Sequence, residues 1–130
     1  ELAGYTANIW GVTASDSRKG HVAWGGPPRT PDLDGTVVPC AVAGSLMLAP
    51  DITLPAVREM RRRFGDSIYG RYGFADAFHP TEGWVNPDVI GIDVGITLLS
   101  AENLRSGRVW QWFMRNPEIP AAMERVGLRR

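Results

Sequence analysis

Residues 37–48 read VVPCAVAGSLML and decide the fold, because they are apolar on almost every side and carry no charge. Pro39 falls in the first turn of a helix, where a missing N–H group costs nothing, and Thr36 is placed to cap that helix. Pro50 follows as a stop. The pattern predicts a buried helix over residues 37–48.

Outward from this segment, amphipathic and apolar helices alternate. Residues 52–64 place apolar side chains on one face and arginines on the other, and Gly65 follows as a C-terminal stop. Residues 93–105 are again apolar with few charges, and residues 109–114 form the next helix after a Ser-Gly break. Two further short helices are expected, at residues 3–10 and 120–126.

This alternation predicts an all-α fold in which apolar inner helices are wrapped by amphipathic outer helices. No strand pattern exceeds short runs. The connections before the two apolar helices are long, about 25 and 28 residues, and those after them are short, about 4 and 3 residues. In consecutive antiparallel helices every second connection lies at the same end, so both long loops share one rim, where we expect the function.

Composition excludes several classes of protein. The 130 residues, 44% of them hydrophobic, suffice for one domain core, and 14 basic residues balance 14 acidic ones, which disfavours a nucleic-acid partner. A single cysteine, Cys40, excludes an internal disulfide and is expected to be a small core residue. No apolar run is long enough to span a membrane. The two histidines lack neighbours at ligand spacing, so neither a metal nor another cofactor is expected.

The two long loops interleave aromatic, acidic and amide side chains. Sugar C–H faces stack on aromatic rings, and carboxylates and guanidinium groups hydrogen-bond hydroxyls, so this mixture favours a neutral carbohydrate ligand over a phosphate. The expected sugar-binding residues are Trp24, Arg29, Asp34, Asp76, Phe78, His79 and Trp84. A structural interpretation stays open, because loop aromatics often pin a loop to the core, and Asp34 or Asp93 can simply cap a turn or helix.

Several blocks of sequence occur in an order that resembles one known family. They are WGVTASD at residues 10–16, YGRYGFADAF at 69–78, GIDVG at 91–95, ENLRSG at 102–107 and FMRNPEI at 113–119. The blocks cover nearly the whole chain, and together they resemble the bacterial glucoamylase-like family.

The resemblance implies an (α/α)6 toroid. The family includes endo-β-1,2-glucanases and the transglycosylating domain of cyclic β-1,2-glucan synthases, so a periplasmic or secreted location is implied as well. Five or six helices are about half of such a ring, and residues 1–130 would therefore be the C-terminal part of one catalytic domain whose N-terminal part is absent from this chain. The missing half, or a second copy, would cover the apolar surface of the inner helices.

Glycoside cleavage needs two carboxyl groups, one to protonate the leaving oxygen and one to act on water or the anomeric carbon. Asp93, at the long-loop end of an inner helix, is the first catalytic candidate, and Glu102 is the second. A structural ion pair with Arg105 or with a loop arginine is the favoured role of Glu102. Nine helical residues separate the two acids by about 13.5 Å, on opposite faces, so the partner of Asp93 is expected upstream.

The sequence therefore predicts part of a glycoside hydrolase-like domain that acts on a β-glucan, in particular a β-1,2-linked glucose polymer, through paired carboxylates. Two alternatives remain open at this point. One is a non-catalytic carbohydrate-binding or structural module, and the other is the transglycosylase domain of a cyclic glucan synthase. The sequence also leaves open whether the isolated chain is active.

Overall fold

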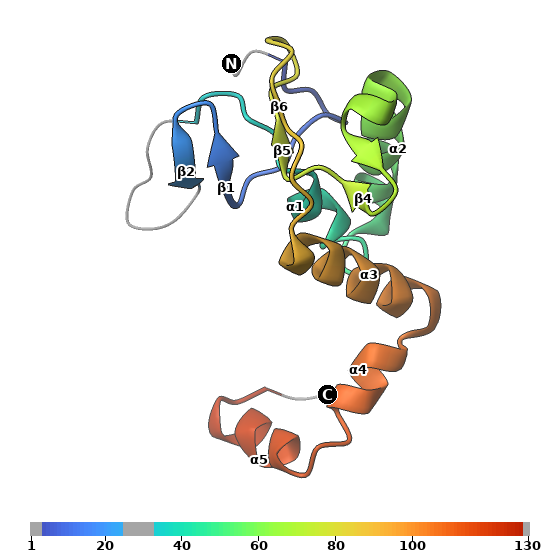
Figure 1. The fold of residues 1–130 in the computed structure, drawn as a ribbon. Helices are drawn as coiled ribbons and strands as arrows, with labels where there is room; N and C mark the ends of the chain where they lie inside the picture. The colour runs from blue at the N-terminus through green and yellow to red at the C-terminus, as the bar shows by residue number, and fades with distance from the viewer. Residues whose placement is uncertain (1–3, 25–32, 129–130) are drawn as a thin grey trace.

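The computed structural model describes residues 4–24 and 33–128, which form five α-helices and three small sheets (Figure 1). The sheets are antiparallel pairs within the two long loops: β1 (Ala14–Ser17) with β2 (Gly20–Ala23), β3 (Tyr69–Gly70) with β4 (Gly73–Phe74), and β5 (Ala77–Phe78) with β6 (Val85–Asn86). The prediction of an all-α chain is therefore confirmed only in part, because the chain combines helices with short strands. Strands of two to four residues are too short to show the two-residue period by which strands are recognised.

The segment at residues 37–48 is helical only in α1 (Pro39–Ala43). Val38 precedes a proline and is extended, so it takes the N-cap position expected for Thr36, and Pro39 begins the helix as predicted. Residues 44–48 continue as turns. Pro50 is not a stop but the first residue of the next helix, α2 (Pro50–Phe64), because proline fits the first turn of a helix.

The amphipathic character of α2 is confirmed. Ala56 and Met60 are fully buried, and the arginines near its end are exposed. Gly65 ends the helix with a positive φ of 55°, which side chains rarely allow. A short 3-10 turn, η1 (Gly65–Ser67), leads into β3.

The expected helix at residues 3–10 is absent from the described part, residues 4–10. The hydroxyl of Thr6 accepts hydrogen bonds from the N–H groups of Asn8 (3.2 Å) and Ile9 (3.0 Å). These local bonds hold a tight turn in place of a helix. Ile9 then enters the core, 1% exposed.

The three C-terminal helices are present as predicted, with somewhat different ends. They are α3 (Gly91–Ser106), α4 (Arg108–Phe113) and α5 (Glu118–Arg125). Asp93 lies in the first turn of α3, whose N-cap is Ile90. In Figure 1, α4 and α5 extend away from the rest of the chain.

The core lies between α1, α2 and the second loop, and is built from Ile9, Val37, Val42, Ala56, Met60, Ile68 and Phe78. In contrast, apolar side chains of α3 and α4 are exposed within this chain. Ile92 is 81% exposed, Leu98 66% and Trp112 58%. The described elements of this chain therefore leave much of the apolar α3 helix exposed.

Candidate functional site

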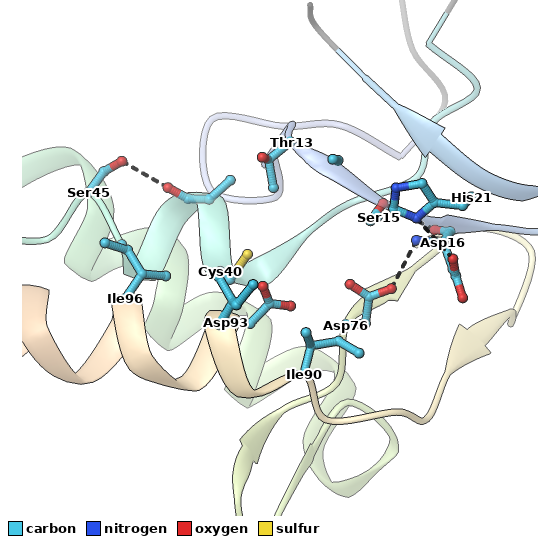
Figure 2. A pocket seen from close by; sticks show the side chains of 14 residues that line it. Thr13, Ser15, Asp16, His21, Cys40, Ser45, Asp76, Ile90, Asp93 and Ile96 are labelled. Carbon is cyan, nitrogen blue, oxygen red and sulfur yellow. Dashed lines mark hydrogen bonds and ion pairs between the residues drawn. The ribbon is translucent and has the colours of Figure 1, made fainter.

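A pocket of about 640 Å³ lies between β1, α1 and the start of α3 (Figure 2). Each wall comes from a different part of the sequence, and α1 and α3 pack directly against each other. Its polar lining includes Ser15, Asp16, His21, Cys40, Asp76 and Asp93. Of the predicted site residues within the described ranges, Asp76 and Asp93 line this pocket.

Asp93 is the most unusual acid of the pocket. Its Oδ2 atom is buried and has no hydrogen-bond partner among the described residues. Burial raises the pKa of Asp93, and the charge and hydrogen bonding of Asp76 raise this pKa further, whereas a hydrogen bond with Cys40 opposes them. Asp93 thus retains its proton to a higher pH than an ordinary aspartic acid, as a general acid requires.

Asp76 is 5% exposed and joins three segments. Its Oδ2 atom accepts hydrogen bonds from the peptide N–H of Asp16 (3.0 Å) and from the side-chain amide of Asn86 (3.1 Å). Its own peptide N–H donates to the carbonyl oxygen of Asp88 at 2.9 Å. Figure 2 shows its carboxyl group directed toward that of Asp93.

Asp16, His21 and Asn86 are site residues that the sequence analysis did not single out. Oδ1 of Asp16 lies 3.2 Å from Nδ1 of His21, its register partner across the β1–β2 hairpin, and Oδ2 accepts a bond from Asn86 at 3.3 Å. The WGVTASD block ends at Asp16, and this block is the one feature of the sequence that pointed toward it.

Cys40 faces the pocket from α1. Burial, followed by the neighbouring Asp93, raises the pKa of its thiol to about 12. The thiol therefore stays protonated near neutral pH, where only a thiolate would be an effective nucleophile. Cys40 serves as a small buried residue and a weak hydrogen-bond donor.

A second pocket, of about 710 Å³, lies between α2, the β3–β4 hairpin and α3. It meets the first pocket at Cys40 and Asp93, which line both. Tyr69 and Tyr72 supply aromatic faces on the hairpin, and the Arg61 guanidinium stacks 4.7 Å from the centre of the Tyr69 ring. Asp93 thus stands between a polar pocket and an aromatic one.

The residues around this acid belong to a chain that matches a known family over most of its length. The model of the Glycoamylase family, which describes glucoamylase-like proteins, matches residues 1–117. The chain belongs to the Glycoamylase family. The resemblance predicted from the sequence blocks is confirmed.

Similar proteins act on β-1,2-linked glucose. An exo β-1,2-glucooligosaccharide sophorohydrolase (non-reducing end) of Parabacteroides distasonis is 32% identical over 123 residues, which are 95% of this Glycoamylase-family chain and 17% of the relative. An endo-β-1,2-glucanase of Chitinophaga pinensis, solved with sophorotriose and glucose, has a TM-score of 0.83 and 34% identity. The alignment covers 95% of this chain and 29% of that structure.

A β-1,2-glucanase structure from Parabacteroides distasonis has a TM-score of 0.82 and 32% identity, and 95% of this chain covers 17% of it. This member of the Glycoamylase family therefore spans less than a third of the length of each of these relatives.

Three of the residues predicted to bind sugar are buried in this chain. Phe78 is 1% exposed and packs against Phe64, with ring centroids 4.7 Å apart. His79 is 3% exposed, and its Nε2 atom lies 2.9 Å from the carbonyl oxygen of Asp34. Trp24 is also buried, at 8% exposed. An aromatic ring with no free face cannot stack on a sugar.

Two other predicted sugar contacts, Trp84 and Asp34, lie outside both pockets. Trp84 packs beside Val38, Cys40 and Ala77. Asp34 holds a turn, because its Oδ1 atom accepts the peptide N–H of Thr36 at 2.9 Å. Arg29 lies outside the residues that the structure describes.

Glu102 does not face either pocket. It forms a bidentate ion pair with Arg105, at 2.9 to 3.1 Å, and accepts a bond from the Ser106 hydroxyl at 2.7 Å. These hydrogen bonds, that of Ser106 first, lower the pKa of Glu102. The ion pair with Arg105 that the sequence analysis favoured is therefore present.

Among residues 4–24 and 33–128, no group of three or more His, Cys, Asp and Glu side chains has the arrangement of a metal site. None of the helices in these ranges is long and apolar enough to cross a bilayer.

Proposed function

We propose that this chain is part of a glycoside hydrolase domain that cleaves β-1,2-linked glucan, with Asp93 as the general acid. The observation that carries this proposal is the partly buried carboxyl group of Asp93, whose Oδ2 atom is buried and which faces a second carboxyl group inside an open pocket. The names of the similar proteins supply the substrate class, because two are β-1,2-glucanases and one is a β-1,2-glucooligosaccharide hydrolase.

In the proposed reaction, Asp93 donates its proton to the glycosidic oxygen as the bond to the anomeric carbon breaks. A raised pKa suits this step, because the acid must still hold its proton when the substrate arrives. The second carboxylate, which acts on water or on the anomeric carbon, comes from the remainder of the domain.

The substrate would extend along both pockets. Asp93 lines both of them, so glucose units on either side of the cleaved bond could occupy the polar pocket and the aromatic pocket. Tyr72, which is 65% exposed, offers a ring face to one of these units. The Arg71 guanidinium lies 5.3 Å from the centre of that ring, where it can donate to sugar hydroxyls.

The complete domain is proposed to be an (α/α)6 toroid in which residues 1–130 form the C-terminal part, with α1 and α3 inside and α2 and α4 outside. The exposed apolar side chains of α3 and α4 support this, because a monomer rarely leaves such a surface uncovered. The rest of the domain, rather than a second copy, would cover them, because the relatives are several times longer than this chain.

The test uses the whole protein that carries this chain, incubated with β-1,2-glucan while the release of reducing ends is followed. Asp93→Asn should reduce turnover by about 10²- to 10⁴-fold with an unchanged circular dichroism spectrum. Glu102→Gln, on the same helix but away from the pockets, is the matched control and should retain turnover. Unchanged turnover in Asp93→Asn would remove Asp93 from the catalytic role.

The products distinguish the alternatives. New reducing ends indicate hydrolysis, whereas cyclic products without new reducing ends indicate transglycosylation. Calorimetric binding of glucan by the unmodified protein without any product would replace the proposal with a carbohydrate-binding module.

A further inference from the structure

The geometry around Asp93 points to a positioning residue: we infer that Asp76 fixes a carboxylate beside Asp93 and thereby governs the pH at which Asp93 releases its proton. The effect on catalysis rests on the proposed role of Asp93 as the acid. The effect on the proton itself does not, and it can be measured separately.

The Asp76 carboxyl group has little freedom to move. It is almost fully buried, and its Oδ2 atom accepts from the Asp16 peptide N–H on β1 and from the Asn86 amide on β6. Both partners are donors, so this oxygen acts as an acceptor. Two donors from two different hairpins fix the carboxyl group more firmly than one flexible contact would.

The other side of the same carboxyl group is turned toward Asp93 (Figure 2). Two neighbouring carboxyl groups in one pocket resist simultaneous ionisation, so one of them keeps its proton. Of these two carboxyl groups, that of Asp93 has a buried oxygen without a hydrogen-bond partner among the described residues. Asp93 would therefore retain its proton both because its carboxyl group is partly buried and because Asp76 lies beside it.

Other groups near Asp93 act in different directions. From α1, the Cys40 thiol donates to Asp93 and favours its ionised form. The remaining ionisable groups that line the two pockets are Asp16, His21, Arg58, Arg61, Tyr69, Arg71 and Tyr72. Among the ionisable groups that line the pockets, Asp76 is the carboxyl group directed toward Asp93, and its charge adds to the effect of burial on the Asp93 pKa.

The first test compares Asp76→Asn with the unmodified whole protein over a range of pH. Removal of the charge should lower the pKa of Asp93 and move the alkaline limb of the kcat/KM profile to lower pH. The carboxyl ¹³C resonance of Asp93, assigned by its loss in Asp93→Asn, reports the same change without any substrate. Asp51→Asn, on the exposed start of α2, is the matched control and should leave both unchanged.

A second measurement needs no variant at position 76. In the unmodified protein, the carboxyl ¹³C resonance of Asp76 should show an inflection at the pH where Asp93 titrates, because the two groups are coupled. A folded Asp76→Asn protein with an unmoved Asp93 resonance, or an Asp76 resonance without that inflection, would overturn the inference. If the resonances behave as expected while Asp93→Asn retains full turnover, the coupling stands and the proposed catalytic role fails.

Discussion

The peptide N–H of Met47 donates a hydrogen bond to Oγ of Ser100 at 2.9 Å, and this bond joins the turn after α1 to the middle of α3. Ser100 is fully buried. Residues 44–48 form turns, so the peptide N–H of Met47 does not bond within a regular helix. The Ser100 hydroxyl supplies the acceptor that this N–H group needs. The bond therefore helps to hold α3, and with it Asp93, against α1.

We expect Ser100→Ala to destabilise the protein by about 1 to 3 kcal/mol, because it leaves the buried N–H of Met47 without an acceptor. Chemical denaturation measures this change. Ser106→Ala, at the exposed end of the same helix, should cost less than about 0.5 kcal/mol. An equal decrease in the free energy of unfolding of the two variants would show that the hydrogen bond to Met47 contributes no more to stability than an exposed serine does.

Phe78→Ala should lower the free energy of unfolding by about 3 to 5 kcal/mol, because Phe78 fills the core beside Phe64. The KM for glucan should change little in whatever fraction stays folded. The matched variant is Tyr72→Ala on the exposed hairpin, for which the opposite pattern is expected, with a raised KM and nearly constant stability. A raised KM in Phe78→Leu would restore the sugar-binding interpretation of Phe78.

The stability of the protein should depend on the ionisation of Asp93. Its pKa is raised by folding, so the folded state binds this proton more tightly than the unfolded state does. The resulting stabilisation is complete below the ordinary aspartate pKa of about 3.9 and is lost as the pH rises through the folded pKa.

Asp93→Asn removes this dependence. Between about pH 4 and neutrality, its free energy of unfolding should therefore fall less steeply with pH than that of the unmodified protein. Denaturation curves at a series of pH values test the difference. Parallel slopes would mean that Asp93 has the same pKa in the folded and unfolded states.

Trp112 tests whether the apolar face of α3 and α4 is covered in the whole protein. Trp112→Ala should destabilise the complete domain by about 3 to 5 kcal/mol if the remainder of the domain packs on this side chain. Ile52→Ala, on the exposed start of α2, should cost less than about 0.5 kcal/mol. A negligible effect of Trp112→Ala on the melting temperature would contradict the proposed packing.

The helices could be predicted from the sequence because their causes are local. The apolar spacing in α2, the glycine after it and the proline at the start of α1 all act within a few residues. The hairpins were missed because they are short and depend on pairing. The burial of Phe78 was missed for the same reason. Phe78 forms a β-bridge with Val37, which lies 41 positions earlier in the chain, and this pairing places it in the core. The sequence near Phe78 does not indicate that partner.

The site could be predicted only where a single residue was distinctive. Asp93 was found because it is an acid in the first turn of an apolar helix that follows a long loop. Asp16 and Asn86 were missed because their importance comes from bonds to each other and to Asp76 across 70 and 60 residues of chain. Contacts between residues so far apart in the sequence are set by the tertiary fold, and the spacing of apolar residues along the sequence does not reveal them.

The bond between Asp16 and Asp76 also has a consequence for synthesis. A ribosome must complete the strand that carries Asp16, then the segment that carries Asp76, and finally the helix that carries Asp93 before these groups can meet. A translation product that stops short of α3 would hold most of the core but would lack Asp93. Premature termination would therefore release a fragment without the proposed acid.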